Sequence, residues 1–285
     1  MPIDLKKALG AEMTPTEGSW TQDDVILYHL GIGAGMENPT EPKELEYTYE
    51  RYLKTLPSFG VIPVFDAIGA MTAVPGIDIN FALVLHGEQE IEIHKPIPIA
   101  AEIESQGRIS GIYDKGKAAL LVTEVVTREK GGDKLFTNRF SIFARGEGGF
   151  GGESGPKAGN VAPDRDPDVL CESKTLPQQA ALYRLSGDKN PLHIDPEFAG
   201  LGGFDTPILH GLCSFGIVCK AVVDTLLDGD VTKVASYGAR FSGVVFPGET
   251  ILTKMWKENG RILIAAESKE RGTPVIGNCA MTLNG

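Results

Sequence analysis

The chain has 285 residues, 42% hydrophobic and 23% charged, which is enough to bury one large core or two modest ones. Its formal net charge of −11 argues against non-specific binding of DNA or RNA, which needs a basic surface. No apolar run approaches the length that spans a bilayer, and residues 1–4 do not start a secretory signal. The composition therefore predicts a globular cytoplasmic protein that binds neither nucleic acid nor membrane.

The first predicted element is a helix from Trp20 to Leu30. Thr21 suits its N-cap, and Asp23 and Asp24 fall in the first turn, where negative charge is favourable. The glycines of residues 31–35 do not complete a G-x-G-x-x-G pattern, and they follow a helix instead of a strand. They therefore indicate a helix end and a loop, and not a dinucleotide site.

Residues 41–54 are charged and predict a surface helix or turn, and the apolar run from Val61 to Met71 has the length of a helix. Four β-like segments rich in valine, isoleucine and leucine follow, namely Asn80 to His94, Ala100 to Tyr113, Ala118 to Thr127 and Lys134 to Ala144. A helix followed by antiparallel strands is typical of a curled sheet that wraps around a central helix.

The composition changes between residues 146 and 167, where glycines and prolines predict a linker or an overhanging loop. The second half then repeats the order of the first. It predicts a short helix at Gln178 to Leu185, an apolar helix at Gly211 to Leu227, and strands at Val234 to Val245, Thr250 to Lys257, Arg261 to Lys269 and Val275 to Leu283. We therefore expect an α+β fold with repeats at 1–145 and 169–285, joined by a linker at 146–168.

Two groups suited to proton transfer lie just before the second apolar helix. Asp188 and His193 are five residues apart, and Pro191 between them has no N–H and biases Asn190 away from helical geometry. The chain must bend there, which can bring the carboxylate and the imidazole to one point. Gly211 at the helix start offers a backbone N–H with no side chain in the way. An acid/base pair beside such an N–H suits the addition of water to an activated C=C bond.

This segment resembles the active-site segment of 2-enoyl-CoA hydratase 2, in the MaoC-like branch of the hot-dog superfamily. The pattern Tyr-x-Leu-Ser-Gly-Asp-x-Asn-Pro-x-His recurs at residues 183–193, and Gly-Phe-x-x-Pro-Ile-Leu-His-Gly-Leu-Cys recurs at residues 203–213. The likeness extends from about Trp20 to the C-terminal strands. It implies a double hot-dog fold, with a non-catalytic first repeat that makes room for the acyl chain and a catalytic second repeat.

The resemblance implies that Asp188 and His193 hold one water, which adds to the β-carbon of a trans-2-enoyl-CoA to give the (3R)-3-hydroxyacyl-CoA. We expect Asp188 to be the base, although the sequence leaves the choice between the two groups open. Asn190 is expected to hydrogen-bond the water or the catalytic loop. The N–H of Gly211 is the expected oxyanion donor, provided that the helix begins near His210. The alternative interpretation is an Asp188 that caps a turn and a His193 that belongs to the core.

The resemblance also assigns residues to the substrate's coenzyme A. His86 and Gly87 are expected to contact the acyl-CoA, Lys115 its phosphates, and Phe241 its adenine or pantetheine portion. Without the resemblance, these residues are an ordinary strand histidine and glycine, a turn lysine and a core phenylalanine. His210 is interpreted as structural.

His29 and His94 show no partner in the sequence, so we expect them to be surface or core residues. The four cysteines, which have no CxxC spacing, are expected to be free, buried thiols: Cys171, Cys213, Cys219 and Cys279. No metal is expected, because the pair His193 and Asp195 has no third ligand at a matching spacing.

No cofactor is expected, since coenzyme A is part of the substrate. A homodimer is implied by the resemblance alone. The expected location is the cytoplasm, or the peroxisome if the chain is one unit of a multifunctional protein, although residues 282–285 do not form a peroxisomal signal.

Two other functions compete with hydration. An acyl-CoA thioesterase is a related hot-dog activity, but no Gly-x-Ser-x-Gly motif is present. A non-catalytic acyl-CoA-binding subunit would be expected to have lost Asp188 or His193. The acyl group stays open, and both fatty-acid and steroid side-chain β-oxidation fit.

Overall fold

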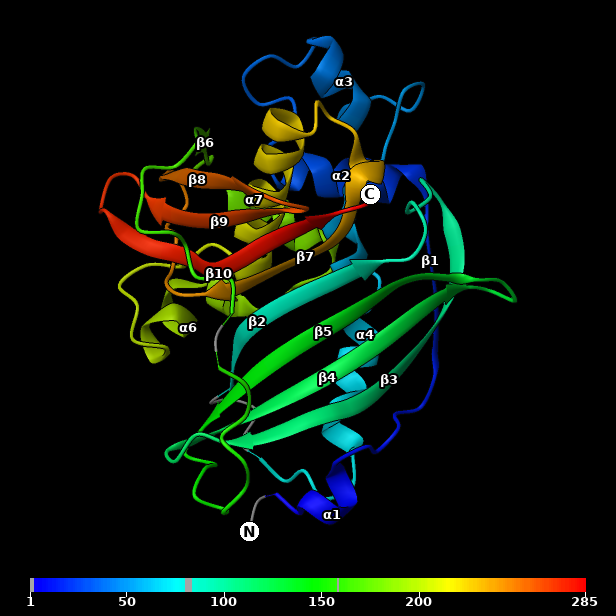
Figure 1. Ribbon diagram of the computed structural model, residues 1–285, viewed down its shortest axis with the longest axis vertical. Helices are drawn as coiled ribbons and strands as arrows, with labels where there is room; N and C mark the ends of the chain where they lie inside the picture. The colour runs from blue at the N-terminus through cyan, green and yellow to red at the C-terminus, as the bar shows by residue number, and fades with distance from the viewer. Residues whose placement is uncertain (1–2, 80–83, 158) are drawn as a thin grey trace.

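The computed structural model describes residues 3–79, 84–157 and 159–285. Its centre is one antiparallel sheet in the order β1-β3-β4-β5-β2-β7-β10-β9-β8-β6 (Figure 1). The first half supplies β1 (Thr16–Trp20), β2 (Val84–Ile93), β3 (Ala101–Asp114), β4 (Ala118–Glu129) and β5 (Lys134–Arg145). The second half supplies β6 (Val169–Lys174), β7 (Val234–Phe241), β8 (Thr250–Glu258), β9 (Arg261–Ser268) and β10 (Thr273–Leu283).

The strand order is the same on both sides of the centre. β2 and β7 pair there, with Glu88 opposite Arg240 and Glu92 opposite Ser236. Moving outward, one side reads β2-β5-β4-β3-β1 and the other reads β7-β10-β9-β8-β6. Because each side uses its strands in the same chain order, the molecule consists of two similar halves joined edge to edge. This is the α+β, double hot-dog architecture that the sequence predicts.

The second half wraps around α7 (Gly211–Leu226), as Figure 1 shows. This helix is buried along most of its length, and Phe215, Val218 and Val222 are fully inaccessible to solvent. A helix that is apolar on nearly all sides must be enclosed by the rest of the protein, which is the role of the surrounding strands. The α7 core is continuous with the first half through Tyr28 and Phe59.

The corresponding helix of the first half is not continuous, so the prediction of one helix from Val61 to Met71 is wrong. The structure has η1 (Pro57–Val61), α4 (Phe65–Gly69) and η2 (Ala70–Ala73) in its place. Pro63 lies in the gap between η1 and α4, and a proline cannot donate the backbone hydrogen bond that would continue a helix.

The remaining short helices are α1 (Leu5–Ala8), α2 (Gln22–Gly31), α3 (Pro42–Thr48), η4 (Arg184–Ser186), η5 (Pro191–His193), α5 (Gln179–Tyr183), α6 (Pro196–Leu201) and η6 (Val231–Lys233). Thr21 caps α2, as predicted, and forms a capping box with Asp24. Trp20, however, ends β1 and does not belong to the helix. The chain from residue 146 to residue 168 has no helix or strand among its described residues.

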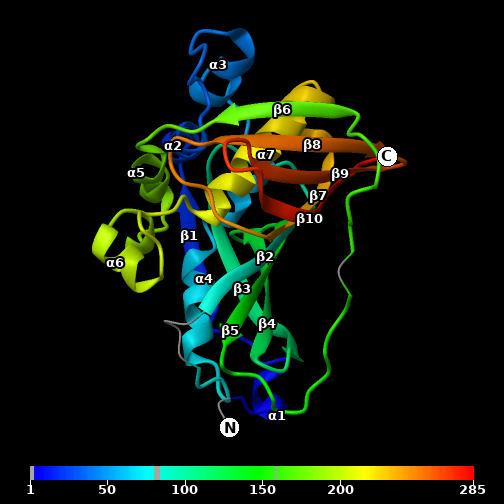
Figure 2. The same cartoon turned by 90° about the vertical axis from the view of Figure 1, so that its left-hand side faces the viewer.

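Figure 2 shows how the helices and this long segment are distributed. α2, α4, α5 and α6 lie on one side of the sheet, whereas the segment after β5 runs along the other side to reach β6.

The predicted strands agree with the observed ones in both halves, except that β7 ends at Phe241 and that β1 and β6 were not predicted. Residues 80–83 of the first predicted strand lie outside the described residues. No described helix is both long and apolar enough to cross a membrane.

Candidate active site

The chain bends between α5 and α6, where two side chains organise the backbone. Gly187 has a φ of +144°, which favours glycine. The Oδ1 of Asp188 then accepts from the N–H of Asn190 (3.1 Å), and the Oδ1 of Asn190 accepts from the N–H of Leu192 (3.0 Å). The carboxylate of Asp188 and a nitrogen of His193 come within 4.8 Å of each other as a result. The turn chemistry that the sequence offered as an alternative is therefore what brings the two groups together.

His193 is held by a backbone carbonyl. Its Nδ1 lies 2.9 Å from the carbonyl oxygen of Ile208. A carbonyl only accepts, so Nδ1 carries the hydrogen and the neutral ring has its lone pair at Nε2. The ring is 8% exposed, and burial lowers the pKa of His193 against the raising effects of the Ile208 bond and the Asp188 charge. His193 is therefore a neutral ring whose Nε2 has no hydrogen-bond partner among the described residues.

His210 is part of the same cluster. Its ring stacks on that of His193, with centroids 3.8 Å apart, and its Nε2 lies 3.2 Å from the carbonyl oxygen of Asp188. Burial, the neighbouring His193 and Arg184 lower the pKa of His210 to about 3. The ring is thus neutral and donates to the catalytic loop. The sequence predicts a structural role for His210, and its position ties the loop to the start of α7.

Gly211 is the first residue of α7, and His210 is its N-cap. The His210 carbonyl accepts from the N–H groups of Cys213 (3.1 Å) and Ser214 (3.2 Å). The N–H of Gly211 lies in the first turn, where a helix supplies no acceptor. A Cβ at position 211 would lie 3.2 Å from the ring of Phe241, so the glycine also permits a close approach.

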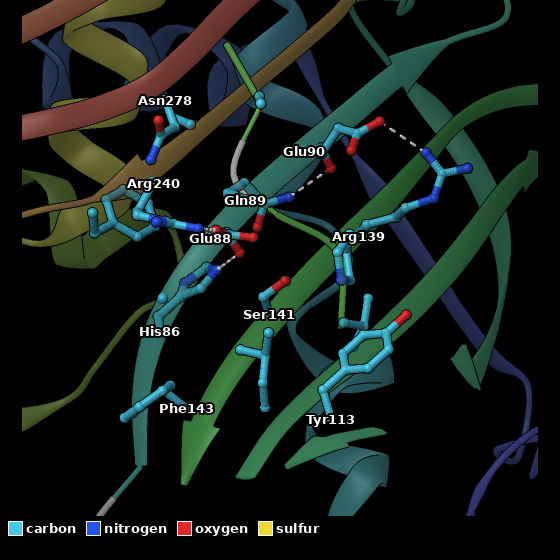
Figure 3. A pocket seen from close by; sticks show the side chains of 18 of the residues that line it. His86, Glu88, Gln89, Glu90, Tyr113, Arg139, Ser141, Phe143, Arg240 and Asn278 are labelled. Carbon is cyan, nitrogen blue, oxygen red and sulfur yellow. Dashed lines mark hydrogen bonds and ion pairs between the residues drawn. The ribbon is translucent and has the colours of Figure 1, made fainter. Parts of the chain in front are cut away.

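A groove of about 700 Å³ is lined by residues of β2 and β7, among others (Figure 3). Its lining includes all four residues that the resemblance assigned to coenzyme A, namely His86, Gly87, Lys115 and Phe241. The ring of His86 packs against Phe241 at 5.0 Å, and burial lowers its pKa to about 4. Among the described residues, the lining does not include Asp188 or His193. Phe241 lies between the groove and the catalytic site, since it lines the groove and its ring would be 3.2 Å from a Cβ at position 211.

Asp188, His193 and His210 also offer three possible metal ligands within 4.8 Å of one another. From the sequence, only the pair His193 and Asp195 is a candidate, with no third ligand, and Asp195 instead caps α6. The geometry does not suit an ion, however. A metal bound by two histidines lies in both ring planes at about 2.0–2.1 Å from each nitrogen. Two rings stacked at 3.8 Å and inclined by 30° have planes that meet much farther away.

Two other histidines have partners that the sequence did not reveal. His29 is fully buried, with its Nδ1 2.9 Å from the carbonyl of Tyr47 and its Nε2 accepting from the N–H of Leu56. His94 contacts the hydroxyl of Thr137 at 2.8 Å. The four cysteines are free thiols, and all except the half-buried Cys171 are buried.

Comparison with known families agrees with this architecture. Residues 19–146 match the MFE-2 hydratase 2 N-terminal domain, and residues 158–278 match the MaoC like domain. The fold and the matched regions together define a MaoC-like protein with two hot-dog halves.

Individual relatives cover nearly the whole chain. It is 48% identical over 278 residues to "Enoyl-CoA hydratase ChsH3" of Mycobacterium tuberculosis, with 97% of each chain covered. It is 41% identical over 283 residues to the peroxisomal multifunctional enzyme type 2 of Mus musculus, covering 97% of this chain and 38% of that protein. The crystal structure of a MaoC-like dehydratase from Phytophthora Capsici superposes with a TM-score of 0.87 at 34% identity, with 99% of each chain covered. The chain belongs to the enoyl-CoA hydratase 2 family.

Proposed function

We propose that the protein is an (R)-specific enoyl-CoA hydratase. It adds water reversibly and in the syn sense to a trans-2-enoyl-CoA and forms the (3R)-3-hydroxyacyl-CoA. The observation that carries this proposal is the convergence of Asp188 and His193 beside the first turn of α7. The relatives named as enoyl-CoA hydratases support it.

The proposed mechanism begins with a water between the two side chains. The carboxylate of Asp188 offers acceptor oxygens. The Nε2 of His193 is an acceptor as well, because the ring's hydrogen is on Nδ1 and is donated to the carbonyl of Ile208. A water that donates one O–H to each group turns its oxygen lone pair toward a third direction. In this proposal the β-carbon of the enoyl thioester lies there.

Asp188 then takes the proton. Burial lowers the pKa of His193, which disfavours the imidazolium and leaves this ring to orient the water. One O–H bond of the water breaks, a C–O bond forms at the β-carbon, and the electron pair moves to the thioester oxygen. The Asp188 carboxyl gives the same proton to the α-carbon on the same face, which restores the carboxylate and makes the addition syn.

Gly211 is the proposed donor to the thioester oxygen. Its N–H points from a helix start, where the helix dipole also favours developing negative charge. One donor of this kind is worth about 2.7–4 kcal/mol in comparable sites. The coenzyme A portion is proposed to occupy the groove of His86, Gly87, Lys115 and Phe241, with Phe241 as the residue shared with the catalytic end.

The test is incubation with crotonyl-CoA. Loss of the enoyl-thioester absorbance without release of free coenzyme A is the expected result, and a (3R)-specific dehydrogenase should oxidise the product. Release of free coenzyme A would identify a thioesterase instead. No change in absorbance would favour a non-catalytic acyl-CoA-binding protein.

Further properties belong to the same proposal. No metal or cofactor takes part, so dialysis against a chelator should leave the rate unchanged. The enzyme is a homodimer of the cytoplasm and works in fatty-acid or steroid side-chain β-oxidation. A panel of enoyl-CoAs of rising length and bulk would identify the acyl group, and light scattering would establish the oligomeric state.

A further inference from the structure

The segment after β5 does more than connect the two halves. We call residues 146–157, 159 and 160 the strap. It runs along the sheet face opposite α4 and α5 (Figure 2). Four of its residues line the groove together with β2 and β7: Pro156, Lys157, Gly159 and Asn160. A segment that looked like a linker in the sequence is therefore a wall of the proposed substrate groove.

One end of the strap is fixed to the turn between β3 and β4. The carboxylate of Asp114 accepts from the N–H groups of Gly149 (2.9 Å) and Gly151 (2.8 Å). The N–H of Asp114 donates to the carbonyl of Glu153 (2.8 Å), and the Nζ of Lys115 donates to the carbonyl of Ser154. These hydrogen bonds hold the glycine-rich part of the strap against a single turn.

The strap is also fixed on both sides of the groove. Gly155, at a φ of +78°, lies so close to Tyr113 that a Cβ would be 2.6 Å from the ring. At the far side, Asn278 lies between Gly159 and Arg240. With its amide oxygen and nitrogen exchanged, as these two neighbours require, it donates to the carbonyl of Gly159 (3.2 Å) and accepts from Arg240 (3.1 Å). Residues 156, 157, 159 and 160 are held between these two attachments, so their position over the groove is built into the fold.

The groove has more positively charged than negatively charged side chains in its lining. Its two carboxylates are already paired, Glu88 with Arg240 at 2.5 Å and Glu90 with Arg139 at 2.9 Å (Figure 3). Lys115 and Lys157 also line the groove, and neither has a carboxylate partner within the described part of the chain. Two cations are therefore left over in a protein whose net charge is −11. A local positive excess on an acidic protein is suited to an anionic ligand.

We propose that the strap is part of the substrate-binding site and that Lys157 binds the phosphates of the acyl carrier, together with Lys115. Asp114 acts through the strap, as the residue that positions it. This inference rests on the proposed function for the identity of the carrier, a phosphorylated nucleotide attached to a pantetheine thioester. It adds a binding element contributed by the segment between the two halves.

The experiment compares two substrates in the Lys157→Met variant. Crotonyl-CoA carries the phosphates, whereas crotonyl-pantetheine has the same thioester and arm without them. We expect the KM for crotonyl-CoA to rise roughly tenfold, as for the loss of one charge-assisted contact, with kcat within about twofold of the original. The KM for crotonyl-pantetheine should not change. Lys269→Met, which removes an exposed lysine paired with Glu172 outside the groove, is the matched control.

Two results would overturn the inference. One is an active Lys157→Met variant whose KM for crotonyl-CoA equals that of the unaltered protein. The other is an equal rise in KM for both substrates, because the lysine would then not recognise phosphate. If the unaltered protein hydrates neither thioester, the proposed function fails instead. Calorimetric titration with free coenzyme A then tests the strap separately, with a dissociation constant expected to weaken roughly tenfold in Lys157→Met.

Discussion

A single backbone carbonyl determines what His193 can do. Because Ile208 accepts the Nδ1 hydrogen, the ring presents an acceptor at Nε2, and burial keeps that ring neutral. Asp188 is in turn fixed by the N–H of Asn190. Each group therefore has one atom committed to the backbone and another available to a water. This division of atoms leads to the first prediction.

Asp188→Asn should lower kcat by about 10²- to 10⁴-fold, the usual contribution of a positioned acid/base group. Asparagine still makes the side-chain turn at this position, so the loop keeps its shape, but an amide cannot take the proton. His193→Gln should reduce kcat similarly, because the water loses its orientation. Hydration of crotonyl-CoA measures both, with circular dichroism as the control for folding. Normal turnover in either variant would refute the assigned roles.

His210 gives a second prediction at this scale. His210→Phe preserves an aromatic ring against His193 but removes the hydrogen bond to the carbonyl of Asp188. Loss of about 1 kcal/mol of loop positioning should lower kcat roughly five- to tenfold. The KM for crotonyl-CoA should stay within about twofold, since His210 does not line the groove. A purely structural histidine would instead reduce the melting temperature with kcat per folded molecule unchanged.

The sequence predicted some of these residues better than others. The motif and Pro191 were enough to place Asp188 and His193 at one bend, because a proline constrains its immediate neighbours. His210 could not be assigned its partner in the same way. The carbonyl that it contacts belongs to a residue 22 positions earlier, and only the folded chain brings the start of α7 back to the loop. Whether Asn190 also reaches the water stays a prediction.

At the scale of elements, uniform apolar runs were the most predictable. α7 was predicted within one residue of its observed ends because its sequence is apolar on nearly all sides. The equivalent run in the first half contains Pro63, and the helix there is interrupted. The edge strands β1 and β6 are short and partly exposed, so they carry little hydrophobic pattern. The strap was predicted to be a linker, and nothing in its composition indicates that glycines 149 and 151 donate to Asp114.

Asp114 tests the strap as an element. Asp114→Ala should free the glycine-rich part of the strap, so that binding must order it again. We expect the KM for crotonyl-CoA to rise roughly three- to tenfold, with kcat nearly unchanged, because an unordered wall reduces affinity without touching the reacting atoms. Asp133→Ala is the matched control, since it removes an exposed aspartate from the next hairpin turn, where its partner is Lys95.

Hydrogen exchange gives an independent measurement of the same change. Amides of residues 149–153 should exchange faster in Asp114→Ala than in the unaltered protein, whereas those of β4 should not. Unchanged exchange in the strap would mean that Asp114 does not anchor it.

At the scale of the whole molecule, the repeat was visible in the sequence but the junction was not. The order of one helix and four strands occurs twice, which predicts two similar halves. That β2 and β7 would pair edge to edge depends on contacts between residues about 150 positions apart, such as Glu88 with Arg240. Such a pairing leaves no local pattern, because each strand alternates in the same way whichever neighbour it has.

Both halves and their junction contribute buried neutral histidines, and these make the stability of the whole chain depend on pH. Burial lowers the pKa of His29 to about 3, of His86 to about 4, and of His210 to about 3. An unfolded histidine has a pKa of about 6.5, so between about pH 4.5 and 6 the unfolded chain binds protons that the folded chain does not. The free energy of unfolding therefore increases as the pH rises through this window, and the protein becomes less stable as the pH falls through it.

His29→Gln isolates one of these contributions. A glutamine can accept from the N–H of Leu56 and donate to the carbonyl of Tyr47, as the neutral ring does, but it does not titrate. Each buried neutral histidine adds about 1.4 kcal/mol per pH unit to the slope of unfolding free energy against pH. Urea titrations between pH 4.5 and 5.5 should therefore give a slope that is smaller by about this amount in His29→Gln, whatever the variant costs in stability at pH 7. Equal slopes in the two proteins would mean that His29 takes up its proton without unfolding. The hydrogen bonds of His29 to the backbone of Tyr47 and Leu56 would then not hold the ring in its neutral form.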